Sequence, residues 1–136
     1  MATKTIICDT DVIIDYWNKN NHRHLNTKDV LENLIQLDNV LLSAVTQMEL
    51  IIGAVNKDEL KRINKNIHQF NIALINDDIT ETAIQLIQTY NISHGLALPD
   101  ALIAATAMTL QVQLFTHNIK DYKFISDLTL YDPVDK

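Results

Sequence analysis

The first apolar run, Thr5-Ile6-Ile7-Cys8, ends in Asp9-Thr10-Asp11 and continues as Val12-Ile13-Ile14-Asp15-Tyr16-Trp17. A short β-branched run that stops at polar residues, with apolar residues at wider spacing after it, is typical of a buried strand and the helix that follows it. Ligands of parallel sheets bind beyond the carboxyl ends of the strands. The stretch therefore predicts a βα unit with Asp9 and Asp11 at the ligand-binding edge.

Two carboxylates at one strand end repel each other and need either protons or a cation nearby. A hard divalent cation is the simplest occupant, because carboxylate oxygens are its preferred ligands. The competing interpretation is that Thr10 or Asp11 is only the N-cap of the helix, a role that both residue types fill well. Both interpretations stay open for Asp11, whereas capping explains Asp9 less well.

The bulk properties describe an ordinary globular protein. Its 136 residues, 47% apolar and 21% charged, predict a single domain over residues 1–136 with one sizeable core. The net charge of -6 gives no broad basic surface for nucleic acid, although a bound cation could set the local charge of a site. The single Cys8, together with the lack of a signal peptide or membrane-length apolar run, predicts a cytoplasmic protein.

The rest of the chain alternates between predicted helices and strands. Residues 18–26 form a polar loop whose His22 and His24 have no acidic or thiol partner nearby, so no metal role is expected for them. Thr27 is the expected N-cap of the next helix. Periodicity and capping residues then predict helices at 28–37, 44–55, 57–70, 79–90 and from Pro99 onward, and strands at 40–43, 72–75, 113–115 and 128–131.

Four acids require an explanation. Asp9 ends the first strand, Glu49 lies among apolar residues of a helix, Asp100 follows Pro99 at a helix start, and Asp121 follows a late strand. Each has an ordinary explanation as a polar flank, a cap or a helix-dipole partner. Because parallel strands end at a shared edge, the four can also converge into one acidic pocket. Oxygen ligands without Cys or His favour Mg²⁺ or Mn²⁺ over zinc.

Four blocks of the chain resemble the PIN domain family and, within it, the VapC-type toxins of bacterial toxin–antitoxin pairs. The resemblance covers nearly the whole chain in the family's order and rests on Ile7-Cys8-Asp9-Thr10-Asp11-Val12-Ile13-Ile14-Asp15, Ser43-Ala44-Val45-Thr46-Gln47-Met48-Glu49-Leu50, Pro99-Asp100-Ala101-Leu102-Ile103-Ala104-Ala105-Thr106-Ala107 and Leu114-Phe115-Thr116-His117-Asn118-Ile119-Lys120-Asp121-Tyr122. It implies a three-layer α/β sandwich with a central parallel sheet of about four to five strands flanked by helices.

The resemblance also implies a Mg²⁺-dependent endoribonuclease, for which Mn²⁺ can substitute. Asp9, Glu49 and Asp100 match the family's three core acids, and Asp9 and Asp100 are the expected metal ligands. Asp121 is the expected fourth catalytic acid, with Asn118 as the alternative at that place. The residues expected to support the pocket are Thr10, Asp11, Thr116 and Asn118.

Partners follow from the same resemblance. Toxins of this type bind a small antitoxin protein and commonly form homodimers. The antitoxin groove is expected at the exposed parts of Ile13, Ile14, Tyr16 and Trp17. RNA contacts are expected at the most basic positions, which are Lys57, Lys61, Arg62 and Lys120. Transfer, ribosomal and messenger RNA all remain open as substrates.

Two alternatives remain. A strand that ends in Asp-x-Asp also begins haloacid-dehalogenase-like phosphatases, in which Asp9 would be the nucleophile and Asp11 the general acid. That interpretation leaves Glu49 and the 99–107 block unexplained. The second alternative is a catalytically inactive PIN-like module that binds RNA or protein, against which the intact acids argue.

Overall fold

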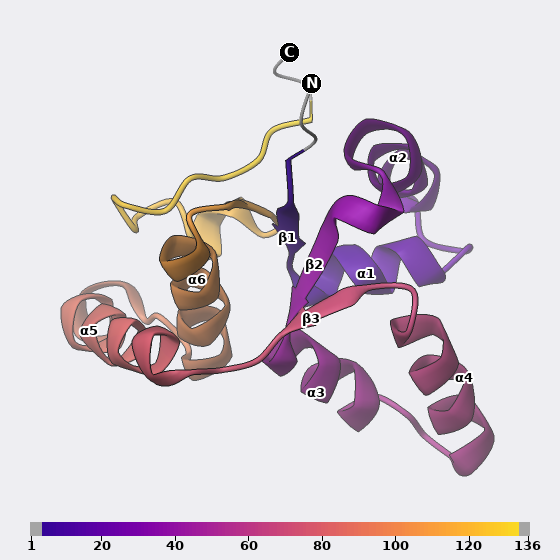
Figure 1. Cartoon of the computed structure of the whole chain (residues 1–136), viewed down its shortest axis with the longest axis horizontal. Helices are drawn as coiled ribbons and strands as arrows, with labels where there is room; N and C mark the ends of the chain where they lie inside the picture. Colours follow the sequence, from indigo (N-terminus) through magenta and orange to yellow (C-terminus); the bar gives the residue numbers. More distant parts are fainter. Residues whose placement is uncertain (1–3, 134–136) are drawn as a thin grey trace.

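The computed structural model describes residues 4–133, which form a parallel four-stranded sheet between two layers of helices (Figure 1). The strands are β1 (Ile6–Cys8), β2 (Val40–Ser43), β3 (Asn71–Ala73) and β4 (Gln113–Phe115). They lie in the order β3-β2-β1-β4, and every pairing is parallel. The predicted fold class is confirmed.

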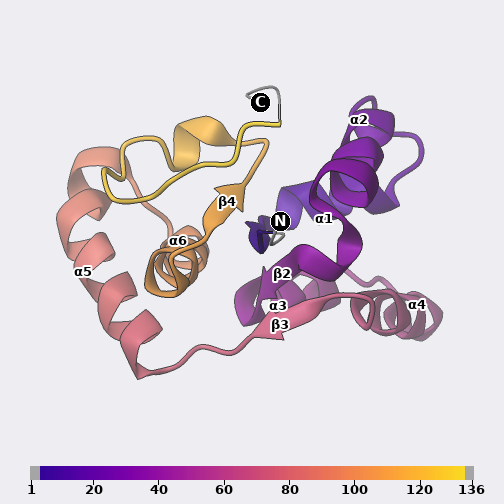
Figure 2. The ribbon, with the colours of Figure 1, turned by 45° about the horizontal axis from the view of Figure 1, so that its top comes forward.

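Helices connect the strands and cover both faces of the sheet. Figure 2 shows α5 and α6 on one side of it and α1, α2 and α4 on the other. The helical elements are α1 (Thr10–Trp17), α2 (His24–Asp29), the π-helical η1 (Val30–Ile35), the 3-10 turn η2 (Leu37–Asn39), α3 (Ala44–Ile52), α4 (Lys57–Ile67), α5 (Asp77–His94), α6 (Leu98–Leu110) and the 3-10 turn η3 (Ile119–Asp121). None of the helices within residues 4–133 is both long and apolar enough to cross a membrane.

The central strand β1 separates two hydrophobic clusters. Ile6 and Cys8 pack in the cluster with α1, and Ile7 packs in the cluster with α5 and α6. This split follows from the two-residue period of a strand, which sends successive side chains to opposite faces. Because both faces are covered, β1 is apolar throughout, and it holds the Asp9 that follows it at a rigid position.

Helix α6 lies close to the sheet because its inner face consists largely of small side chains. Ala101, Ala104, Ala105 and Ala107 are all completely buried. This close packing positions Asp100, in the first turn of α6, beside the sheet edge. The sequence block that begins at Pro99 therefore packs α6 against the sheet and also positions Asp100 at the site.

Replacing Ala104 by Leu is expected to lower the free energy of unfolding by about 1–3 kcal/mol, because the added carbons have no space between α6 and the sheet. Urea denaturation measures the change. Ala97→Leu is the control, since Ala97 is exposed before the same helix. Equal stability of the Ala104→Leu variant and the unmodified protein would contradict close packing at this position.

Two local predictions were wrong. Thr27 is not an N-cap but a fully buried residue of α2, which begins already at His24. In the loop before it, Arg23 pairs with Asp15 at 3.3 Å, and the His24 ring lies 3.1 Å from the main-chain carbonyl oxygen of Asp15. The predicted last strand is reduced to one parallel bridge, between Leu114 and Leu130.

Candidate active site at the carboxyl edge of the sheet

Asp9 directly follows β1 and is the N-cap of α1. Its Oδ1 accepts a hydrogen bond from the Thr10 main-chain N–H at 2.8 Å, and its exposed fraction is only 6%. The N-cap of α1 is therefore Asp9, and not Thr10 or Asp11. A cap explains one oxygen of Asp9 but not the burial of the whole carboxylate.

Thr10 joins α1 to Glu49 of α3. Its hydroxyl donates to Glu49 Oε1 at 2.6 Å, and the hydroxyl oxygen of Thr46 lies 3.0 Å from the Thr10 hydroxyl oxygen. Thr46 is fully buried and lies three residues before Glu49, on the same side of α3. These contacts fix one oxygen of Glu49 close to the N-terminus of α1.

The loop after β4 supplies donors to both acids of the first strand end. The Thr116 hydroxyl donates to Asp9 Oδ2 at 2.8 Å, and the His117 main-chain N–H donates to Asp11 Oδ2 at 3.1 Å. The Asn118 main-chain N–H donates to the Thr116 hydroxyl oxygen at 3.0 Å, while the Asn118 side chain is exposed. The contact that Asn118 makes in this pocket therefore comes from its backbone.

Asp100 enters the same pocket from α6. The buried Tyr122 hydroxyl donates to Asp100 Oδ1 at 3.2 Å and also interacts with Asp9. Burial and then the charge of Asp9 raise the pKa of Asp100, and the negative charge of Asp121 adds to this effect, which indicates that Asp121 lies nearby. Burial, followed by the charges of Asp9 and Asp100, raises the pKa of Tyr122, so its hydroxyl stays protonated and donates.

Burial and mutual repulsion raise the pKa of three acids in this pocket. Burial raises the pKa of Asp9, against hydrogen bonds from Thr116 and Thr10 that lower it. Burial and then the charge of Asp9 raise the pKa of Asp11 to about 7 and that of Asp100 to about 6. The charged forms of these acids are therefore unfavourable in the pocket, and a bound cation would stabilise them.

The donor set fits a hard divalent cation. The acids offer carboxylate oxygens, and Asp11 Oδ1 is buried without a hydrogen-bond partner among the described residues. Within residues 4–133, no three acidic, His or Cys side chains form a ready-made ligand cage. Mg²⁺ does not need one, because it keeps several waters and is commonly held by one or two carboxylates. Asp9 and Asp100 suit that role.

Four predicted contact residues lie outside the acidic pocket. Lys57, Lys61 and Arg62 are exposed on α4, and Lys120 is exposed in η3. Arg62 lines a cavity that reaches an acid. This cavity of about 610 Å³ also borders Glu49, Ile14 and Trp17.

One part of the predicted antitoxin groove was wrong. Ile13 is completely buried in the core, because it points from α1 toward the sheet, and it cannot line a groove. Ile14 is 49% exposed and lines the 610 Å³ cavity together with Trp17. Tyr16 is half-buried, and its hydroxyl donates to Glu32 at 2.8 Å.

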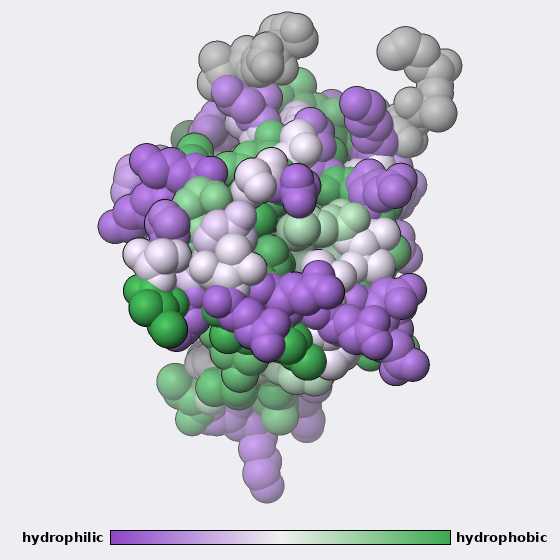
Figure 3. Space-filling view, turned by 90° about the vertical axis from the view of Figure 1, so that its left-hand side faces the viewer, coloured by the Kyte–Doolittle hydropathy of each residue, from purple (hydrophilic) through white to green (hydrophobic). Residues whose placement is uncertain are grey.

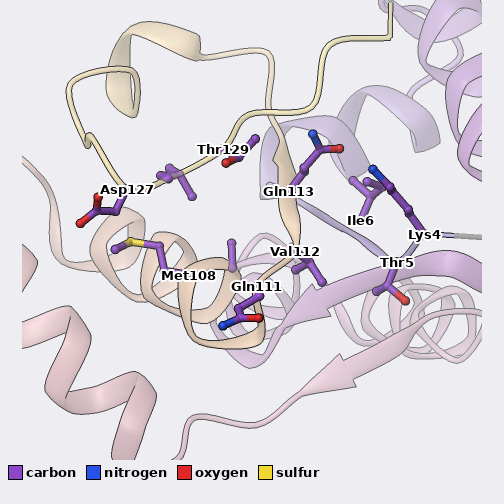
Figure 4. A pocket seen from close by; sticks show the side chains of 11 residues that line it. Lys4, Thr5, Ile6, Met108, Gln111, Val112, Gln113, Asp127 and Thr129 are labelled. Carbon is purple, nitrogen blue, oxygen red and sulfur yellow. The ribbon is translucent and has the colours of Figure 1, made fainter. Parts of the chain in front are cut away.

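A second cavity lies at the opposite end of the sheet. It has a volume of about 460 Å³, and the residues at its rim include Lys4, Gln111 and Asp127 (Figure 4). It borders the start of β1 and the start of β4, whereas the acids lie beyond the ends of these strands. This cavity is therefore separate from the acidic pocket.

Three residues of the site were not predicted, namely Thr46, Tyr122 and His117. Thr46 carries a local signal, because it lies one helical turn before Glu49. Tyr122 could only have been inferred from its place at the end of the fourth block, since its partner Asp100 is 22 residues away. The hydrogen bond from the His117 main-chain N–H to Asp11 could not be predicted from the residue type, because nearly every residue has a main-chain N–H.

Tyr122→Phe is expected to lower the turnover of any reaction at this pocket about tenfold, because a hydrogen bond that orients Asp100 is lost. The thermal midpoint should change little, since the ring keeps its packing. Steady-state kinetics and thermal unfolding measure the two effects. Unchanged turnover with an unchanged fold would exclude an orienting role for the hydroxyl.

Known proteins resemble this chain over most of its length. A chain of a toxin–antitoxin complex from Klebsiella pneumoniae is 32% identical and superposes with a TM-score of 0.75, over 95% of this chain and 98% of that one. FitAcB from Neisseria gonorrhoeae is 26% identical, with a TM-score of 0.73 over 97% of this chain and 100% of that one. Ribonuclease VapC19 of Mycobacterium tuberculosis is 29% identical over 92 residues, which are 67% of this chain and 73% of the relative.

The sequence profile of the PIN domain matches residues 6–125. This range includes all four strands and every residue of the acidic pocket described above. The chain belongs to the PIN domain family.

Proposed function

We propose that this protein is a divalent-cation-dependent endoribonuclease and the toxin of a toxin–antitoxin pair. The observation that carries the proposal is the convergence of Asp9, Glu49 and Asp100 from three distant parts of the chain. Family membership and the resemblance to a ribonuclease and to toxin–antitoxin structures support it. Mg²⁺ is the proposed cation, with Mn²⁺ as a substitute.

Asp9 and Asp100 would hold the cation, and their neighbours orient them. Thr116 and the Thr10 main-chain N–H each hold one oxygen of Asp9, and Tyr122 holds one oxygen of Asp100. A bound cation supplies activation of water and stabilises charge on the leaving oxygen, without a covalent enzyme intermediate.

Glu49 and Asp121 complete the proposed catalytic set. Because Thr10 engages Oε1 of Glu49, its Oε2 is available to orient the attacking water. Asp121 contributes negative charge beside Asp100. We propose Asp121 as the fourth acid in preference to Asn118, whose side chain is exposed.

The RNA backbone would approach along α4. This helix carries Lys57, Lys61 and Arg62 on its exposed surface, and Arg62 shares a cavity with Glu49. Lys120 provides a further cation in η3. These residues offer local positive charge on a chain whose net charge is -6.

The cavity between α1, α3 and α4 is the proposed antitoxin groove. Its apolar wall includes Ile14 and Trp17, and the indole N–H of Trp17 is buried without a partner among the described residues. An antitoxin segment in this cavity would lie against Glu49 and would exclude RNA from the same place. Tyr16 would support the groove from behind through its bond to Glu32.

Trp17→Ala is expected to weaken binding of the cognate antitoxin at least ~10-fold, because it removes the large aromatic wall of the groove. Titration of the antitoxin by fluorescence or calorimetry measures the change, and circular dichroism monitors the fold. Trp17→Phe is the matched control, since it keeps an aromatic wall. Unchanged affinity in a folded Trp17→Ala variant would move the antitoxin to another surface.

A homodimer is also part of the proposal. The side of the molecule on which α5 lies shows apolar areas among polar ones (Figure 3). Ile84 and Ile92 of α5 and Leu98 of α6 are exposed by 51%, 97% and 63%. We propose this side of the molecule as the contact with a second copy of the chain.

The proposal is tested by incubating the purified protein with total cellular RNA in Mg²⁺ and in EDTA. Discrete fragments with Mg²⁺ and intact RNA with EDTA are expected. Intact RNA in both, from folded protein, would contradict the nuclease. Capture of beryllium fluoride on Asp9 would then indicate the phosphatase, and RNA binding without cleavage would indicate the inactive binding module.

A further inference from the structure

The loop after β4 holds two acids of the pocket although it has no regular structure of its own. Thr116 donates to Asp9, and the His117 main-chain N–H donates to Asp11. A loop in this position needs an anchor, because a shift of the loop moves both donors.

The His117 side chain reaches from this loop to two helices. Its Nε2 lies 3.0 Å from the hydroxyl oxygen of Thr27 in α2 and 3.6 Å from Oδ2 of Asp15 in α1. Its ring meets the Phe115 ring edge-on, at a centroid distance of 5.2 Å and an angle of 78°. The loop is therefore joined to α1, α2 and β4 through one side chain.

The partners of His117 are themselves rigid. Thr27 is completely buried, and Asp15 is only 4% exposed and is also held by Arg23 at 3.3 Å. Burial lowers the pKa of His117, while Asp15 opposes this effect and Arg23 adds to it. The neutral ring is therefore favoured, and the nearby carboxylate favours the form with the proton on Nε2.

The ring is not placed for direct chemistry. Its Nε2 faces Thr27 and Asp15, and its connection to the acidic pocket is made by its own backbone and by the adjacent Thr116. A residue with this geometry acts through the groups it orients. Partners of this kind behind metal ligands typically change metal affinity by 10–100-fold when they are replaced.

We propose that His117 is a positioning residue, which clamps the loop after β4 to Thr27 and Asp15 so that Thr116 and the His117 N–H hold Asp9 and Asp11 ready for a cation. The proposal rests on the proposed metal-dependent function. It makes the contact between Thr27 and His117, which are 90 residues apart in sequence, part of what positions the acids of that site.

Three substitutions separate the contact from simple packing. Thr27→Val removes the hydroxyl and keeps the volume. His117→Gln keeps an amide nitrogen where the imidazole has Nε2, whereas His117→Asn places its amide at the position of Nδ1 and cannot reach Thr27. Thr109→Val is the matched control, because the buried Thr109 hydroxyl has no hydrogen-bond partner among the described residues.

Mn²⁺ affinity, measured by electron paramagnetic resonance, is the first readout. Thr27→Val and His117→Asn are expected to weaken Mn²⁺ binding ~10-fold, while His117→Gln and Thr109→Val stay close to the unmodified protein. The Thr27→Val/His117→Asn double variant should bind no worse than the weaker single variant, because both remove one contact. In RNA cleavage, kcat should fall with little change in KM.

Hydrogen exchange of the His117 and Asn118 amides is the second readout and needs neither metal nor RNA. Thr27→Val should speed their exchange ~10-fold and leave the β1 amides unchanged. Unchanged exchange and Mn²⁺ affinity, or additive losses in the double variant, would overturn the proposal. If the unmodified protein binds Mn²⁺ but cuts no RNA, only the proposed nuclease fails, and the two readouts still decide the role of His117.

Discussion

Replacing Asp9 by Asn is expected to lower RNA cleavage by at least ~10³-fold, because a cation ligand worth several kcal/mol of transition-state stabilisation is lost. The fold should remain, since Asn caps a helix about as well as Asp and can accept the same hydrogen bond from Thr10. The thermal midpoint of the Asp9→Asn variant should equal or exceed that of the unmodified protein, because the repulsion between Asp9 and its acidic neighbours disappears.

Cleavage assays in Mg²⁺ and thermal unfolding measure both parts of this result. The control is Asp127→Asn, which neutralises an exposed acid at the opposite end of the sheet. It should cleave as the unmodified protein does. An Asp9→Asn variant with undiminished cleavage would remove Asp9 from the catalytic set.

The second large effect is a pH-dependent stabilisation by Mg²⁺. The pKa values of Asp11 and Asp100, about 7 and about 6, lie above their ordinary values, so the folded protein binds these protons more tightly than the unfolded chain. The stability contributed by these two acids is therefore complete at low pH and is lost as pH rises through 6 and 7. Mg²⁺ should restore it at high pH, where the carboxylates are charged.

At pH 8, saturating Mg²⁺ is expected to raise the thermal midpoint by roughly 5–10 °C, the range for a ligand at about 100 times its Kd. At pH 5 the rise should be much smaller, because protons compete for the same oxygens. The lowered pKa of His117 acts in the opposite direction, because its contribution to stability is gained as pH rises. Equal shifts at both pH values, or a full shift in Asp9→Asn, would contradict the site.

The sequence alone predicted the features that depend on local patterns. The apolar runs at β1 and β4 and the helix start at Pro99 each have a short-range signal in periodicity or capping. Asp9, Glu49 and Asp100 could be placed together because parallel strands end at one edge. The family resemblance then gave these acids a function.

Long-range partners could not be predicted in this way. Thr27 was predicted to cap a helix. Its actual contact is with His117, which lies 90 residues away in the sequence and leaves no local signal. Ile13 and Ile14 have the same side chain, and their positions around the axis of α1 decide that Ile13 is buried and Ile14 is exposed. The last predicted strand shortened to a single bridge because pairing with β4, and not the β propensity of residues 128–131, decides how much of a strand forms.

The most direct test of the acidic pocket is a crystal structure of the protein with Mn²⁺, read from the anomalous signal of the metal. We expect a peak at about 2.1 Å from carboxylate oxygens of both Asp9 and Asp100. The same crystals of the Asp9→Asn variant should lack that peak. A peak that contacts neither carboxylate, in protein that binds Mn²⁺ in solution, would contradict a cation site at the carboxyl edge of the sheet.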